Sequence, residues 1–190
     1  MNSLINRVLR AALLDKEFFK EAEADASLNQ EALMVVVIVS IAGGVGAFLA
    51  NLLGGEFFAA IGAFIISTIV GIANYYIWAY VAHFIGTNMF QGEADPGELL
   101  RVLGYASGPR ILSLLGFIPC FGALLGFVGG IWVLIAGFFG VKEALELDTT
   151  ETLVTVVLGW LVIFIIYALV TSVVGIGAMG FKSILSSLGI

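Results

Sequence analysis

Charge is scarce in this sequence. Of its 190 residues, 8 are Lys or Arg and 14 are Asp or Glu, which is 12% of the chain, while 61% are hydrophobic. An average globular protein has roughly 25% charged residues, and so few cannot cover the surface of a water-soluble domain. The composition excludes an ordinary soluble enzyme, a disordered tail and a nucleic-acid binder, which needs a basic patch. An integral membrane protein remains.

Cysteine and histidine are equally scarce, with one of each. A single cysteine, Cys120, excludes an intramolecular disulfide and any cysteine-based metal cluster. His83 alone cannot form a multi-histidine site, and the chain has no G-x-S-x-G or Walker-type loop. Every aspartate falls outside the apolar stretches, so no Ser-His-Asp set has a plausible buried geometry. We therefore expect a protein that is not an enzyme and carries no cofactor or metal.

Long apolar runs dominate what is present. Four stretches contain no charged residue: 32–55, 57–92, 111–141 and 152–181. A helix needs about 20 apolar residues to cross the hydrocarbon core of a bilayer, so each stretch holds at least one span. Pro119 divides the third stretch. Ending a helix there predicts an all-α, polytopic membrane helix bundle with five transmembrane spans, at about 31–53, 57–85, 99–118, 121–141 and 152–180.

The third predicted span carries Arg110 near its middle, which leaves the span count open. A central arginine costs about 2.5–3.5 kcal/mol on insertion scales, and each Leu, Ile, Phe or Val returns about 0.3–0.6. The segment is marginal alone, and we expect it to insert with help from its neighbours. In the alternative, a bundle of four spans, Pro119 kinks one long helix and residues 99–109 lie at the membrane surface.

Lysine and arginine set the expected orientation, because they favour the cytoplasmic side of a membrane. Four of the eight precede the first span, and with five spans Arg101 and Lys142 also fall at cytoplasmic ends. The amino terminus is then cytoplasmic and the carboxyl terminus external. Residues 1–26 lack a signal-peptide pattern and fit a cytoplasmic amphipathic helix in the membrane interface. Residues 27–190 form the transmembrane domain.

Three short motifs predict helix starts. In each, Ser or Asp is followed three residues later by Glu or Gln, which is the spacing of a capping box. The pairs are Ser27 with Gln30, Asp95 with Glu98, and Asp148 with Glu151. They stand before the first, third and fifth spans, which supports the five-span count. A divalent-metal loop at the middle pair is the alternative, but it lacks the alternating oxygen ligands of a calcium site.

Glycine is abundant, with 24 residues. Small residues let helices approach closely in a membrane, where lipid supplies no hydrophobic drive for association. Two stripes have the four-residue spacing that this packing uses: Gly122, Gly126 and Gly130 on the fourth span, and Ala42, Gly46 and Ala50 on the first. We expect them to pack helices within one monomer. A homo-oligomer interface is the alternative.

Two polar sets within the spans are candidates for binding. The third span holds Gly104, Tyr105, Ser107, Pro109 and Arg110, and the second holds Tyr76, Tyr80 and His83 with Thr87 on one face. Arg110 lies about 13 Å deeper than Arg101 at helical rise, and an intramembrane charge is a functional-site hypothesis. Its alternative is a clamp on carbonyls that Pro109 frees. The second set is either a cavity lining or an aromatic belt with an interfacial histidine.

The third span contains the block Leu100-Arg101-Val102-Leu103-Gly104-Tyr105-Ala106-Ser107-Gly108-Pro109, and Ile118-Pro119, Ile131-Trp132 and Gly140-Val141-Lys142-Glu143 follow in order. These landmarks resemble the Yip family, integral membrane proteins named for interacting with Ypt/Rab GTPases. The resemblance implies five spans, a cytoplasmic amino terminus, the Gly-Tyr motif at Gly104 and Tyr105, and in eukaryotic members a role in membrane traffic. The family's Asp-Leu-Tyr-Gly-Pro motif is absent, which argues against GTPase binding. The compact form resembles prokaryotic members.

Two functional hypotheses follow. The leading one is a non-enzymatic protein of a prokaryotic plasma membrane that organises or scaffolds membrane proteins or lipids. Its partners are then the lipid bilayer and other membrane proteins, and not nucleic acid. The alternative is a small transporter, channel or lipid-translocating protein that uses the polar site around Arg110. A water-accessible cavity at Arg110 favours transport, and a tightly packed bundle favours the scaffold.

Overall fold

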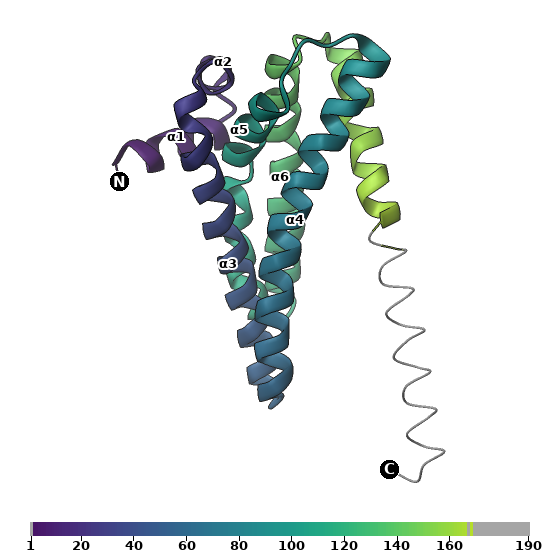
Figure 1. The fold of residues 1–190 in the computed structure, drawn as a ribbon. Coiled ribbons are helices and arrows are strands. Elements are labelled where there is room, and N and C mark those ends of the chain that lie inside the picture. The colour runs from purple at the N-terminus through teal and green to yellow at the C-terminus, as the bar shows by residue number, and fades with distance from the viewer. Residues whose placement is uncertain (1, 167, 169–190) are drawn as a thin grey trace.

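The computed structural model describes residues 2–166 and residue 168, and within them the fold is all-α, as predicted. The elements are α1 (Asn2–Ala12), α2 (Lys16–Ala24), η1 (Ala26–Leu28), α3 (Asn29–Leu53), α4 (Phe57–Phe90), α5 (Pro96–Ala106), η2 (Gly108–Phe117) and α6 (Phe121–Ala144), where η1 and η2 are 3₁₀ segments. A further helix, Thr149–Ile166, follows α6 (Figure 1). The remainder of the predicted span 152–180 lies outside the described residues, apart from Ala168.

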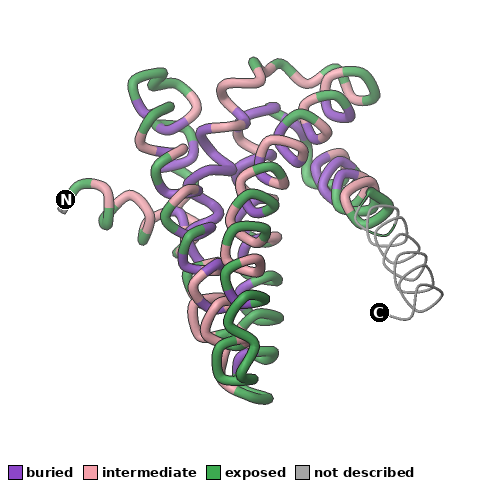
Figure 2. Tube along the Cα trace, turned by 60° about the horizontal axis from the view of Figure 1, so that its bottom comes forward, coloured by how far each residue is buried: buried purple, intermediate pink, exposed green. Residues whose placement is uncertain are grey.

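Four helices of the described chain are long and apolar enough to cross a membrane: Ala26–Leu53, α4, α6 and Thr149–Ile166. α3 and α4 run side by side away from the end that holds α1 and α2 (Figure 1). Figure 2 shows exposed residues concentrated toward the far end of this hairpin and buried residues near the other end. Large apolar side chains such as Phe58 and Ile66 are exposed there. Such an apolar surface fits lipid rather than water.

The continuous helix predicted over 99–118 is not found. α5 ends at Ala106, and the chain continues as the 3₁₀ segment η2. Pro109 lacks an N–H and its ring opposes α-helical continuation, and Gly108 before it weakens the helix further. The two pieces together still follow α3: Gly46 has no room for a Cβ because the backbone of Ser113 lies against it. The third predicted span therefore consists of a short α-helix followed by a 3₁₀ segment instead of one continuous helix.

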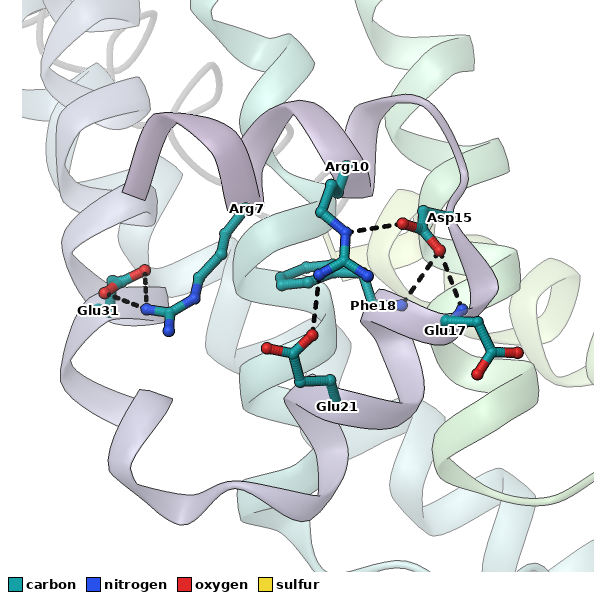
Figure 3. Close-up of polar contacts among 7 residues, drawn as sticks. All are labelled: Arg7, Arg10, Asp15, Glu17, Phe18, Glu21 and Glu31. Carbon is teal, nitrogen blue, oxygen red and sulfur yellow. Dashed lines mark hydrogen bonds and ion pairs between the residues drawn. The ribbon is translucent and has the colours of Figure 1, made fainter. Parts of the chain in front are cut away.

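The amino-terminal segment is two helices rather than the single amphipathic helix that its apolar arc predicted. Leu14, between them, has a φ of 64°. The Asp15 carboxylate then caps α2 by accepting the N–H groups of Glu17 (3.1 Å) and Phe18 (3.2 Å). Arg10 donates to Asp15 (2.7 Å) and to Glu21 (2.8 Å), which ties α1 to α2 (Figure 3). This guanidinium also lowers the pKa of Asp15.

α2 packs on the bundle as a cap. Its Phe18 and Phe19 are fully buried, so these apolar side chains pack on the protein and not, as expected of an interfacial helix, on the bilayer. Arg101 of α5, also buried, holds the end of this helix by donating to the backbone oxygens of Ala22 (2.8 Å) and Glu23. The last carbonyls of a helix attract a cation, so Arg101 serves as the C-terminal anchor of α2.

Two of the three predicted capping boxes are confirmed. The Asp95 N–H donates to the Glu98 carboxylate (3.0 Å) at the start of α5. The Asp148 N–H does the same to Glu151 (3.2 Å) before the last described helix. The box at Ser27 is wrong, because the neighbouring aspartate, Asp25, caps η1 instead and accepts the Ser27 N–H (2.9 Å). An aspartate two residues upstream competes successfully for the same orphan N–H.

Candidate binding site

Arg110 is partly buried within the bundle. Gly71 of α4 faces it, since a Cβ added at Gly71 would lie 3.5 Å from the Arg110 Nη2 atom and 2.7 Å from the Ser40 hydroxyl of α3. Gly71 is about 21 Å from the start of α4, and Ser40 about 17 Å from the start of α3, at 1.5 Å per residue. The guanidinium therefore lies near the middle of both long helices.

A pocket of about 240 Å³ opens beside Arg110. It lies between α4, α5, η2, α6 and the helix Thr149–Ile166, and most of its lining is apolar or glycine. Its lining contains no Asp or Glu. The lining residues with polar side-chain atoms are Asn74, Tyr75, Trp78, Ser107, Arg110, Ser113 and Trp160.

Within the described residues, the Arg110 guanidinium makes no hydrogen bond and no ion pair. The clamp interpretation required it to bond carbonyls that Pro109 frees, and no such bond is seen there. The carbonyl of Arg110 instead accepts the Ser113 hydroxyl (2.6 Å). A charge taken out of water without a partner is expensive. Its position at a pocket leaves room for a negatively charged group.

A buried donor next to the pocket, which lies against Gly159 of the last described helix, is also unused. Trp78 is 7% exposed, and its buried Nε1–H has no partner in the described chain. Two other donors are committed within the protein: Tyr75 donates to the Leu100 oxygen (2.7 Å) and Ser107 to the Gly104 oxygen (2.6 Å). The described lining of the pocket thus offers a cation and no acidic group, which suits an anion.

The predicted site residues Gly104 and Tyr105 lie elsewhere, in the joint between α5 and α3. Tyr105 is fully buried, donates its hydroxyl to Glu31 (2.8 Å) and meets the Phe18 ring edge-on. Arg7 of α1 donates to both oxygens of the same Glu31 (3.0 and 2.9 Å; Figure 3). A Cβ at Gly104 would lie 2.8 Å from that of Ala32. This pair of residues therefore joins helices and does not line the pocket.

The second predicted set does not line the pocket either. His83 Nε2 contacts the Ala94 oxygen (2.9 Å), and Thr87 donates to the His83 oxygen (2.8 Å), which fixes the turn between α4 and α5. Tyr80 is exposed, and Tyr76 packs edge-on against its neighbour Tyr75. Of the eight predicted site residues, Ser107, Pro109 and Arg110 line the pocket.

Sequence reasoning missed Asn74, Tyr75 and Trp78, which α4 contributes to the pocket. Their spacing at i and i+4 puts Asn74 and Trp78 on one face, and an amide inside an apolar span was an available signal. The prediction that the glycine stripe on α6 packs against another helix is also wrong for two of its three glycines. A Cβ at Gly126 or Gly130 would meet no described residue within 4 Å, and both glycines line the pocket rather than a helix contact.

The chain as a whole is similar to one protein family, the one that its sequence landmarks resemble. The model of the Yip1 domain matches residues 11–181. The chain belongs to the Yip1 domain family. No curated protein and no solved structure matches it. The match runs from the end of α1 past the last described helix, so the pocket around Arg110 lies entirely within the Yip1 domain.

Proposed function

We propose that this Yip1-domain protein is a non-enzymatic membrane protein that organises lipids, and with them neighbouring membrane proteins, by holding the acidic group of a lipid at Arg110. The observation that carries the proposal is the unpaired guanidinium at a pocket near the middle of α3 and α4. An arginine within the bilayer faces the bundle interior or a cavity and pairs with an opposite charge. The described chain offers no such partner, and an acidic lipid supplies one.

We also propose that the chain crosses a prokaryotic plasma membrane five times, with a cytoplasmic amino terminus and an external carboxyl terminus. α5 and η2 together serve as the third crossing, because they follow α3 from the end with α1 and α2 toward the start of α6 (Figure 1). α1 lies in the membrane interface. Its side chains Ile5 and Leu9 are exposed, and so is Leu13 directly after the helix, at four-residue spacing, which is the apolar stripe of an interfacial helix.

Retention of acidic lipid tests this function. The full chain is reconstituted in phosphatidylcholine nanodiscs that contain minor fractions of oleate and phosphatidic acid, and bound lipid is measured by native mass spectrometry. Arg110→Gln should lower the retention of acidic lipid about tenfold or more, because a hydrogen bond to a charged group contributes roughly 1.5–3 kcal/mol. Arg110→Lys keeps the positive charge but loses the planar guanidinium that can donate two parallel hydrogen bonds. Its retention of acidic lipid should therefore lie between that of wild type and that of Arg110→Gln. Equal retention by wild type and Arg110→Gln contradicts the proposal.

Movement of an anion or lipid across the bilayer is the second candidate function. The observation that favours it is the position of the pocket at a helix break, where α5 ends at Ala106 and η2 begins at Gly108 with Pro109 in its first turn. Irregular backbone at membrane depth occurs where it lines a cavity or is buried in protein. Liposomes with the full chain should then show saturable flux of a fluorescent acidic lipid or small anion. An unchanged rate in Arg110→Ala would exclude this role for the pocket.

A further inference from the structure

An apolar groove lies next to the pocket of Arg110, between α6 and the helix Thr149–Ile166. Its volume is about 550 Å³, and every lining residue is aliphatic or aromatic. The α6 side contributes residues between Ile131 and Phe138, about 10 Å along the helix axis, and the other side residues between Leu153 and Trp160. Several of these side chains are exposed, among them Ile135 and Val157. The groove therefore faces an apolar neighbour in the membrane.

The pocket and the groove share two lining residues, Leu134 and Trp160. The polar end of the combined space is the unpaired Arg110. The other end is wholly apolar. A space with a cationic end and an apolar end fits an amphiphile whose acidic head is joined to a hydrocarbon tail.

The junction of the two spaces restricts the kind of lipid. Leu134 and the Trp160 ring are apolar, and the only polar atom that these two side chains supply is one indole nitrogen. The two ester groups of a diacyl glycerolipid placed there would have at most this one indole N–H to share, and leaving ester oxygens without a partner is costly in an apolar site. A head attached directly to its chain avoids this cost. One guanidinium balances one negative charge, and its planar fork matches a carboxylate with two parallel hydrogen bonds.

We propose that the protein binds a long-chain carboxylic acid, with the carboxylate on Arg110 and the hydrocarbon chain in the groove between α6 and the helix Thr149–Ile166. This inference rests on the proposed function and names the lipid that fills the site. Lipid tails outside the protein are as apolar as the groove, so the groove adds shape selection rather than hydrophobic drive. The head supplies most of the affinity, and the groove selects the tail.

Photocrosslinking tests the position of the chain. The full chain in phosphatidylcholine nanodiscs is exposed to a palmitate analogue with a diazirine near the end of its tail, and labelled peptides are mapped by mass spectrometry. Val157→Trp fills the groove, and Leu161→Trp is its matched control, exposed on the same helix but outside the groove. Labels should fall between 131 and 138 and between 153 and 160. Val157→Trp should reduce labelling about tenfold through steric exclusion, while Leu161→Trp matches wild type.

The outcomes separate this inference from the function on which it rests. Equal labelling of Val157→Trp and Leu161→Trp, or labels spread over α4, overturns the groove assignment. Lysophosphatidic acid that displaces the probe better than palmitate does overturns the carboxylate assignment. In both cases the role of Arg110 stands if Arg110→Gln still weakens acidic-lipid binding. Should Val157→Trp fail to fold by circular dichroism, Ile135→Trp blocks the groove from the α6 side and must give the same loss of labelling.

Discussion

At the scale of single residues, glycine has two different uses in this Yip1 domain. Gly104 is a close-packing glycine, since a Cβ there would lie 2.8 Å from the Cβ of Ala32 and 3.0 Å from its oxygen. Gly126 faces the pocket, where a Cβ would meet nothing within 4 Å. Gly104 has Gly108 four residues further on, as Gly126 has Gly130, so the two patterns look alike in the sequence. Only the position of the neighbouring helix separates a glycine that holds the fold together from one that keeps a space open.

Alanine substitution should separate these two uses. Gly104→Ala should destabilise the protein by about 1–3 kcal/mol, because overpacking a tight contact with backbone has that cost. Gly126→Ala should be neutral or stabilising by about 0.5–1 kcal/mol, because alanine has the better helix propensity and meets no atom. Thermal unfolding in one detergent, followed by circular dichroism, measures both. A lower melting temperature for Gly126→Ala than for Gly104→Ala would refute this distinction.

Tyr105 contributes through one hydroxyl. Tyr105→Phe keeps the ring contact with Phe18 but removes the hydrogen bond to Glu31. We expect a loss of about 1.5 kcal/mol, since the acceptor is charged, and faster amide exchange in α1, because Arg7 shares that carboxylate. Tyr76→Phe is the matched control on a partly buried tyrosine. Unchanged exchange in α1 would show that the hydroxyl does not secure that helix.

At the scale of elements, the cap formed by α2 carries the clearest electrostatic strain. Glu23 lies in a polar hollow with Lys20, Lys142, Glu143 and Glu146. Partial burial raises its pKa to about 7, and repulsion from Glu98, Glu143 and Glu146 adds to the shift, while Lys20 opposes it. One carboxylate oxygen of Glu23 is buried without a hydrogen-bond partner. The folded state therefore holds a proton that the unfolded chain releases.

This linkage predicts a pH-dependent cap. The pKa of Glu23 is raised from its ordinary value of 4.5 to about 7, so folding stability falls as pH rises through that window and the full penalty is present above it. Glu23→Gln should remove the dependence and stabilise the cap at pH 8 by about 1 kcal/mol, a figure reduced for solvent screening. Hydrogen exchange of α2 amides at pH 5.5 and pH 8 measures this. Glu17→Gln, exposed on the same helix, should keep the wild-type profile.

The elements also show how far sequence reasoning reaches. Apolar length predicts α3, α4 and α6 within a few residues, except that α4 continues to Phe90 beyond its last strongly apolar turn. Near Pro109 the backbone changes from an α-helix to a 3₁₀ helix. The spacing of apolar residues along the sequence does not reveal that change. Arg110 was identified because an intramembrane charge is conspicuous. Its neighbours Asn74 and Trp78 were not, because which face of α4 turns inward depends on the packing of four other elements.

At the scale of the whole molecule, the number of crossings determines the side on which each loop lies. Cys120 precedes α6, at the end of that helix away from α1 and α2 (Figure 1), and it is exposed. With five crossings and a cytoplasmic amino terminus, Cys120 is external. With four spans, in which Pro119 kinks one long helix, it lies inside the membrane. The single cysteine of the chain is therefore a native reporter of topology.

Labelling of intact cells with a membrane-impermeant maleimide should modify Cys120, because an external, exposed thiol reacts as its thiolate in water. In a Cys120→Ser background, Glu56→Cys in the α3–α4 turn is the external control and Ser27→Cys is the cytoplasmic one; both positions are exposed. Glu56→Cys should label before permeabilisation and Ser27→Cys only after it. Two outcomes would rule out the broken α5–η2 segment as a crossing. In one, Cys120 is labelled only after permeabilisation, like Ser27→Cys. In the other, Cys120 is not labelled even in permeabilised cells. If Cys120 is labelled before permeabilisation, like Glu56→Cys, the α5–η2 segment crosses the membrane. Arg110 then lies inside the bilayer, where an acidic lipid is its most favourable partner.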